Sequence, residues 1–201
     1  MVNYYDKYRE DIKTGDIVLF SGNNNSSRFI RYVTKSKWSH VGMVIKIHDY
    51  DVVLLWESTT MNDIPDFYDK VPKYGVMMVP LSERVRAYDG EVYLRRLSNP
   101  ISYDMVKQLV ALRDEVKNRP YEQDKWDMIR SVIDSGSSFE NKRDLSSIFC
   151  SELVAEALQR IGLITNTIAS DEFTPKDFGK GCLVDTLMTG KTYGAELALK
   201  A

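Results

Sequence analysis

Residues 38–57 have the sequence WSHVGMVIKIHDYDVVLLWE, in which two apolar, β-branched runs flank a short polar segment. The runs 41–47 and 52–56 have the composition of buried strands. The polar segment 49–51 (DYD) between them has the residue types of a tight turn. This stretch therefore predicts a β-hairpin, and the rest of the fold can be built outward from it.

Outside this hairpin, the type of predicted element changes once, near Pro100. Residues 17–20, 76–79 and 91–97 are apolar or alternating runs that predict further strands. Beyond Pro100 the pattern is mostly helical. No segment is long enough to act as a linker, so we predict one α+β domain over residues 1–201.

Three helices are predicted from apolar residues that recur at helical spacing. The first is short, and Ser26 or Ser27 is expected to cap it. The second begins at Ser102 and is stopped by Pro120. The third runs from about residue 150 to residue 161, so the second and third helices follow all the predicted strands.

The composition is that of a globular chain without a strong overall charge. Of 201 residues, 43% are apolar and 28% are charged, and the net charge is −2, which gives no support to nucleic-acid binding. The longest apolar runs are far shorter than the roughly 20 residues that span a bilayer. Residues 1–10 are charged and Tyr-rich, unlike a signal peptide. We therefore expect a cytoplasmic protein with no transmembrane segment and no nucleic-acid partner.

The cysteines and histidines are too few to suggest a disulfide framework or a metal site. The chain has only Cys150, Cys182, His40 and His48, and none of them forms a CxxC, HxxxH or HExxH motif. We therefore predict no metal and no cofactor. Cys182 is expected to be a structural thiol that does not pair with Cys150.

Cys150 is the candidate nucleophile. As the first residue of the predicted helix, it would meet unpaired backbone N–H groups and the positive end of the helix dipole, which favour the thiolate. The same N–H groups could stabilise an oxyanion. The alternative is that Cys150 is a small buried hydrophobe, as most free cysteines are.

His40 is the candidate general base, and Glu57 is the candidate residue that orients it. Folding the chain about the predicted turn brings both to the same open end of the hairpin. A carboxylate there would fix the tautomer of the imidazole and stabilise its protonated form. His48, at the other end of the strand, is the competing imidazole, with a solvated hairpin position as the alternative. For Glu57, the alternative is an exposed carboxylate paired with Lys35 or Lys37.

Four separated blocks occur in an order that is typical of one family: TGDIVLF (14–20), WSHVGMV (38–44), WES (56–58) and FCSELV (149–154). Together they resemble the circularly permuted NlpC-type papain-like cysteine hydrolases of the YiiX-like branch. In the unpermuted enzymes the cysteine comes first, whereas here the order is His40, Glu57, Cys150. The resemblance covers roughly residues 12–180 and implies an α+β fold in which helices pack on an antiparallel sheet.

The resemblance also implies a function. It implies a thiol hydrolase without a cofactor, in which Cys150 attacks an acyl carbon, His40 transfers the proton and Glu57 orients His40. The bond would be an amide or an ester, and the implied substrates are small molecules, peptides or acylated amines and lipids. The unpermuted members carry Pro-Tyr before the cysteine motif, which implies a substrate-binding role for Tyr121; packing is the alternative role.

Two other functions remain open. In lecithin retinol acyltransferase-like relatives an alcohol or amine replaces water, but the third residue there is usually histidine, and here it is Glu57. A catalytically silent ligand-binding module is the other alternative, against which the joint presence of Cys150, His40 and Glu57 argues. We assign specificity to the loops 62–74 and 134–144, and the sequence leaves substrate identity and oligomeric state open.

Overall fold

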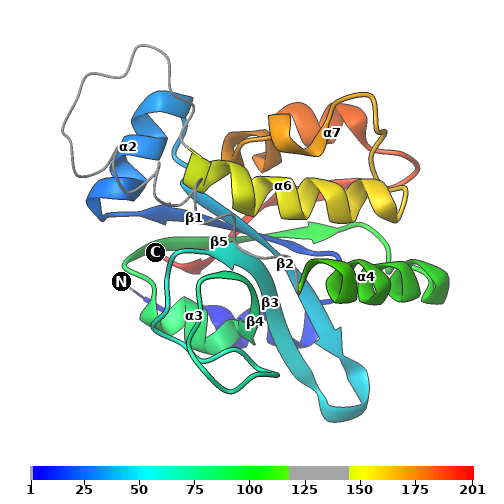
Figure 1. The fold of residues 1–201 in the computed structure, drawn as a ribbon, viewed down its shortest axis with the longest axis horizontal. Coiled ribbons are helices and arrows are strands. Elements are labelled where there is room, and N and C mark those ends of the chain that lie inside the picture. Colours follow the sequence, from blue (N-terminus) through cyan, green and yellow to red (C-terminus); the bar gives the residue numbers. More distant parts are fainter. Residues whose placement is uncertain (1, 118–144) are drawn as a thin grey trace.

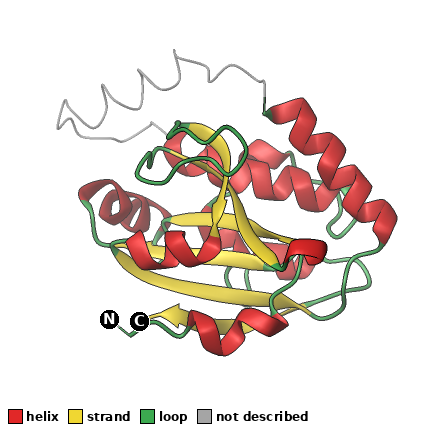
Figure 2. Cartoon of the chain, turned by 90° about the horizontal axis from the view of Figure 1, so that it is seen from below, coloured by secondary structure: helices red, strands yellow, loops and turns green. Residues whose placement is uncertain are grey.

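The computed structural model describes residues 2–117 and 145–201. In these ranges six strands form one antiparallel sheet in the order β4-β3-β2-β1-β5-β6 (Figures 1 and 2). The strands are β1 (Ile17–Gly22), β2 (His40–Ile47), β3 (Val52–Thr59), β4 (Gly75–Pro80), β5 (Gly90–Leu97) and β6 (Tyr193–Lys200). The five predicted strands are confirmed, and β6 is an additional one.

The predicted hairpin is formed by β2 and β3, and its register fixes the positions of the candidate site residues. Met43 pairs with Trp56, and the 3₁₀ helix η2 (His48–Tyr50) makes the turn. Glu57 follows Trp56, so it lies beside Gly42 and two residues from His40. Because side chains alternate between the faces of a strand, Glu57 and His40 share one face.

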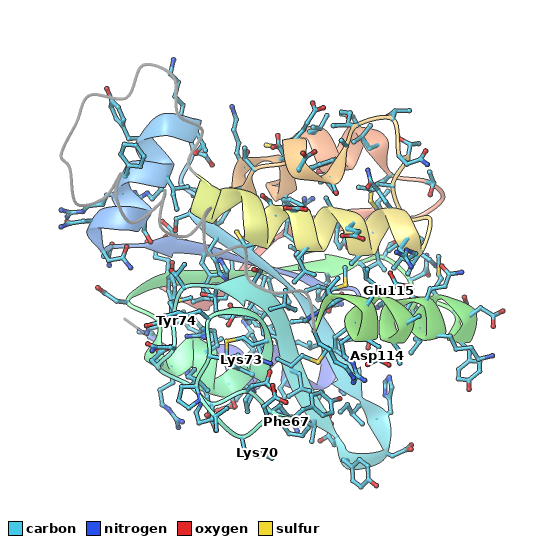
Figure 3. All side chains as sticks on the ribbon, in the orientation of Figure 1. Phe67, Lys70, Lys73, Tyr74, Asp114 and Glu115 are labelled. Atoms are coloured by element: carbon cyan, nitrogen blue, oxygen red, sulfur yellow. The ribbon has the colours of Figure 1, made fainter. Side chains whose placement is uncertain are left out.

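One face of the sheet is covered mainly by the long helices (Figure 1). This face carries α4 (Tyr103–Val116), α6 (Leu145–Arg160), η3 (Ser170–Glu172), η4 (Pro175–Phe178) and α7 (Leu183–Leu187). Apolar side chains of α4, α6, η4 and α7 form one core with alternate residues of β1, β2 and β3. The Arg160 guanidinium ties α6 to Glu115 of α4, which Figure 3 labels, with N–O distances of 3.0 and 2.9 Å.

The opposite face of the sheet packs against shorter elements. These are α1 (Tyr5–Tyr8), η1 (Arg9–Asp11) and α3 (Leu81–Ala87). The apolar residues of α1 and α3 form a second core with the other set of strand residues. α2 (Asn25–Thr34) follows β1 and leads into β2 (Figure 1). Among the described helices, none combines the length and the apolar character that crossing a bilayer requires.

Several boundaries differ from those predicted. α2 is capped by Asn24, whose side chain accepts a hydrogen bond from the Ser27 amide, instead of by Ser26 or Ser27 themselves. α6 begins at Leu145 instead of at Cys150; its first turn contains two serines, which are weak helix formers and give little sequence signal of a helix. The predicted stop at Pro120 lies outside the described residues.

Two elements were not predicted from the sequence. α3 has only seven residues, too few for a helical period to stand out. β6 contains Gly, Ala, Glu and Lys, which are depleted in strands, and it forms by pairing with β5. The interpretation of the chain after Pro100 as mostly helical is therefore wrong at its C-terminal end.

Candidate active site

His40 is the first residue of β2, and the residues before it lock its position. The Ser39 amide donates to the Phe20 carbonyl at 2.8 Å, and the Ser39 hydroxyl accepts from the Gly22 amide at 3.0 Å. His40 then pairs with Phe20 across β1, with their ring centroids 5.1 Å apart. The imidazole is consequently buried against the sheet and has little freedom to rotate.

Glu57 lies where the hairpin register predicts, and its carboxylate contacts His40. The Nε2 atom of His40 is 2.7 Å from Oε2 of Glu57, which is fully buried. Since an ionised carboxylate only accepts hydrogen bonds, Nε2 carries the proton. The Nδ1 atom is then left for the other partner of the ring.

That other partner is Cys150, which hydrogen-bonds the His40 side chain. Cys150 comes from α6 and is 1% exposed. The structure therefore brings together the three residues His40, Glu57 and Cys150, from β2, β3 and α6.

The position of Cys150 within its helix corrects one expectation. Cys150 is the sixth residue of α6, which begins at Leu145, so it lies beyond the first turn. Only the first four N–H groups of a helix lack intrahelical partners. The argument that Cys150 meets unpaired helix-terminal amides, and that these form an oxyanion site, is therefore wrong for this structure.

The contacts of His40 with Cys150 and Glu57 also determine its pKa. Burial alone would lower it, but the charge and hydrogen bond of Cys150, followed by those of Glu57, outweigh burial and raise the pKa of His40 to about 9. A histidine with such a pKa holds its proton at neutral pH. His40 is therefore an imidazolium that contacts the Glu57 carboxylate on one side and Cys150 on the other.

Glu57 is itself kept ionised by a further residue, which the sequence did not indicate. Burial opposes ionisation, but the charge of Arg84, from α3, and then the contacts with His40 keep the pKa of Glu57 below its usual value. Arg84 Nε donates to Oε1 of Glu57 at 2.9 Å. A buried arginine on a short helix has no distinguishing sequence signal, because most arginines lie on the surface.

A pocket of about 100 Å³ opens next to His40. Most of its lining residues carry hydroxyl groups, and its walls come from α2, β2, the end of β3 and the segment after α3. The residues are Asn24, Ser27, Ile30, Ser39, His40, Ser58, Thr59, Thr60, Met61 and Tyr88. Such a lining suits a neutral polar group that can exchange hydrogen bonds with hydroxyls.

The remaining candidates lie elsewhere. His48 is exposed at the far end of β2. Cys182 is a half-buried free thiol before α7, and burial raises its pKa. Tyr121 and loop 134–144 are outside the described residues.

No residue of the loop 62–74, to which specificity was assigned, lines the pocket beside His40. Residues 60 and 61, just before that loop, do line it. Farther along, Lys70 Nζ lies 4.4 Å from the ring centroid of Phe67, and Asn62 donates to the hydroxyl of Tyr74; Figure 3 labels Phe67, Lys70 and Tyr74. In residues 2–117 and 145–201, no group of three or more His, Cys, Asp or Glu side chains is arranged to hold a metal ion.

Comparison with known proteins gives one family match. The family model described as permuted papain-like amidase enzyme, YaeF/YiiX, C92 family, matches residues 11–180. No curated protein matches the chain. Among solved structures, the chain is similar to that named metalloprotein yiiX from Escherichia coli O157:H7, with 20% identity and a TM-score of 0.46. The similarity covers 74% of this chain and 66% of that one.

Proposed function

The chain belongs to the C92 family of permuted papain-like amidases, and on this premise we propose that it hydrolyses an amide or ester bond through an acyl-enzyme on Cys150. The family is one of thiol hydrolases, and the expected circularly permuted papain-like fold is confirmed. The roles of His40 and Glu57, the type of bond and the substrate class are our proposal.

The proposed reaction has two stages. The Cys150 thiolate attacks the acyl carbon, and the tetrahedral intermediate collapses to a thioester as His40 gives its proton to the leaving amine or alcohol. Water then attacks the thioester while Nδ1 of His40 takes its proton. The released acid leaves, and that proton restores the imidazolium beside the thiolate. Throughout, Nε2–H of His40 donates to Glu57, which keeps the ring in one orientation.

The observation that carries this proposal is the contact of His40 with both partners. Its Nε2 lies 2.7 Å from Glu57, and the same side chain hydrogen-bonds Cys150. A nucleophile, an adjacent base and a third group that orients the base form the usual arrangement for covalent thiol catalysis. The adjacent hydroxyl-lined pocket offers a place for a neutral polar part of a peptide, acylated amine or lipid substrate.

Acyl transfer to an alcohol or amine is the second candidate function. It shares the thioester stage and differs only in what attacks it. The presence of Glu57 where acyltransferase-like relatives usually carry histidine favours water as the acceptor. Adding increasing concentrations of a primary amine to a turnover assay separates the two, since a transferase diverts most product into the new amide.

The experiment that tests the proposal measures iodoacetamide alkylation against pH. All proteins carry Cys182→Ser, so that only Cys150 reacts. We expect alkylation of the parent to persist well below pH 7, and His40→Ala to move the pH midpoint upward by at least one unit, because the imidazolium is lost.

His48→Ala is the matched control, because it removes the other, exposed imidazole, and it should leave the midpoint unchanged. If the parent and His40→Ala alkylate with the same profile, centred near pH 8.5 as for an ordinary thiol, the proposal is wrong. The ligand-binding module would then be the better description of the chain.

A further inference from the structure

Each oxygen of the Glu57 carboxylate has a different partner. Oε2 contacts His40, whereas Oε1 accepts a hydrogen bond from Arg84 Nε at 2.9 Å. Oε1 also lies 2.8 Å from Arg84 Nη2, but this second contact is an ion pair without hydrogen-bond geometry. Arg84 is fully buried, and its Nη1 donates to Asp63 at 2.7 Å. The guanidinium therefore spans two carboxylates and is held from both sides.

We propose that Arg84 is a positioning residue for this site: it keeps Glu57 ionised and directs the second carboxylate oxygen at the His40 ring. This inference rests on the proposed function. A carboxyl group as buried as that of Glu57 would take up a proton if no cation were beside it. A protonated Glu57 would stabilise the imidazolium of His40 less, and the thiolate of Cys150 would lose its counter-ion.

The direction in which the pKa of His40 changes when Arg84 is removed shows whether Arg84 acts through Glu57 or directly on His40. A cation acting on His40 through space would repel the imidazolium, so its removal would favour protonation of His40. A cation acting through Glu57 has the opposite effect. The charged or titratable side chains around Glu57 are His40 from β2, Arg84 from α3 and, beyond them, Asp63, Tyr88 and Cys150.

The test measures the pH midpoint of Cys150 alkylation in the Cys182→Ser background. We expect Arg84→Met to raise the midpoint by about one unit, which makes alkylation about tenfold slower at pH 6. Arg84→Lys keeps the charge and should restore most of the difference. An unchanged or lowered midpoint in a folded Arg84→Met protein would overturn the proposal.

Arg95→Met is the matched control. Arg95 is the other fully buried arginine of the described residues, and it forms an ion pair with Asp185 away from His40. Its substitution should destabilise the protein without moving the alkylation midpoint. If Arg95→Met moves the midpoint as far as Arg84→Met does, the effect is a general loss of stability and the inference fails.

A double variant keeps the test usable if Arg84→Met does not fold. Glu57→Gln combined with Arg84→Met removes both buried charges together, so neither is left unpaired. If Arg84 acts through Glu57, the double variant should have the same midpoint as Glu57→Gln alone. A further shift in the double variant would show independent action and overturn the proposal.

Failure of the inference can be told apart from failure of the proposed function. If the parent protein alkylates like an ordinary thiol, the proposed function itself is wrong. If the parent and His40→Ala behave as proposed but Arg84→Met matches the parent, only the role of Arg84 is wrong.

Discussion

At the scale of single residues, Asp16 shows how one buried carboxylate can support two segments of backbone. Its Oδ2 accepts from the Lys13 amide at 3.0 Å, and its Oδ1 accepts from the Leu97 amide of β5 at 2.8 Å. Burial nevertheless dominates and raises the pKa of Asp16 to about 6. The folded protein therefore holds the Asp16 proton more tightly than the unfolded chain does.

This predicts a pH dependence of stability. Because the folded pKa is raised from 3.8 to about 6, the contribution of Asp16 is fully present below pH 4 and is lost as pH rises through 6. The loss should amount to about 3 kcal/mol at most, from 1.36 kcal/mol per pKa unit. Urea unfolding of the parent and of Asp16→Asn between pH 4 and 7 measures it.

The difference in unfolding free energy between these two proteins isolates Asp16, because the other carboxyl groups titrate in both. The unfolding free energy of the parent should rise relative to that of Asp16→Asn as pH falls from 6 to 4. Parallel pH curves for the parent and Asp16→Asn would contradict the prediction.

At the scale of elements, α2 links a local cap to the pocket. The Asn24 side chain accepts from the Ser27 amide at 2.8 Å, and both residues line the pocket beside His40. α4 has a comparable cap, in which the Ser102 side chain accepts from the Met105 amide at 3.3 Å, on an element that does not line the pocket. Removing each cap in turn therefore separates an effect on stability, which both caps share, from an effect on the pocket, which only Asn24 contacts.

We predict that Asn24→Ala and Ser102→Ala each destabilise the protein by about 1 kcal/mol, the usual value of an N-cap. Only Asn24→Ala should also lower turnover of a substrate, because fraying of α2 moves one wall of the pocket. Thermal unfolding and steady-state kinetics measure the two effects. Equal turnover in both variants would mean that α2 does not contribute to substrate binding.

At the scale of the whole molecule, Arg95 of β5 joins the sheet to the C-terminal segment. Its guanidinium contacts both carboxylate oxygens of Asp185 in α7 at 2.9 Å. It also donates to the carbonyls of Phe178 at 2.8 Å and Gly194 at 2.9 Å. One side chain of β5 therefore holds η4, α7 and β6 against the sheet.

Substituting Arg95 tests this connection against its neighbour in the same strand. Arg95→Met should lower the free energy of unfolding by about 3 kcal/mol, because it breaks a buried ion pair. Arg96 is partly exposed and pairs with Asp11 at 2.9 Å. Arg96→Met should therefore lower the free energy of unfolding by less than about 1 kcal/mol. Chemical denaturation of both variants provides the comparison, and equal losses would contradict the assigned role of Arg95.

The two ends of the chain meet at this scale as well. The Val2 amide donates to the Ala201 carbonyl at 2.7 Å, and the Tyr4 amide donates to that of Leu199 at 2.7 Å. The N-terminal segment thus pairs with the outer edge of β6, as Figure 2 shows for the two termini. This pairing covers part of a sheet edge that would otherwise be open.

The sequence by itself determined the hairpin and, with it, the proximity of His40 and Glu57. Alternating and apolar runs around a polar turn specify strands over a short stretch, and the turn sets their register locally. The order of the four family blocks determined the fold family and pointed to Cys150. These features could be predicted because each depends on residues that are close together in the chain or on an ordered motif.

Only the tertiary structure decided the rest of the site. Because α6 begins at Leu145, Cys150 does not lie at the helix terminus where it was expected. β6 forms because its backbone pairs with that of β5. Arg84 is buried because Glu57 and Asp63, from other segments, meet its charge. An ionised side chain is buried only where charged partners from distant segments of the chain contact it, and no local sequence pattern predicts such long-range contacts.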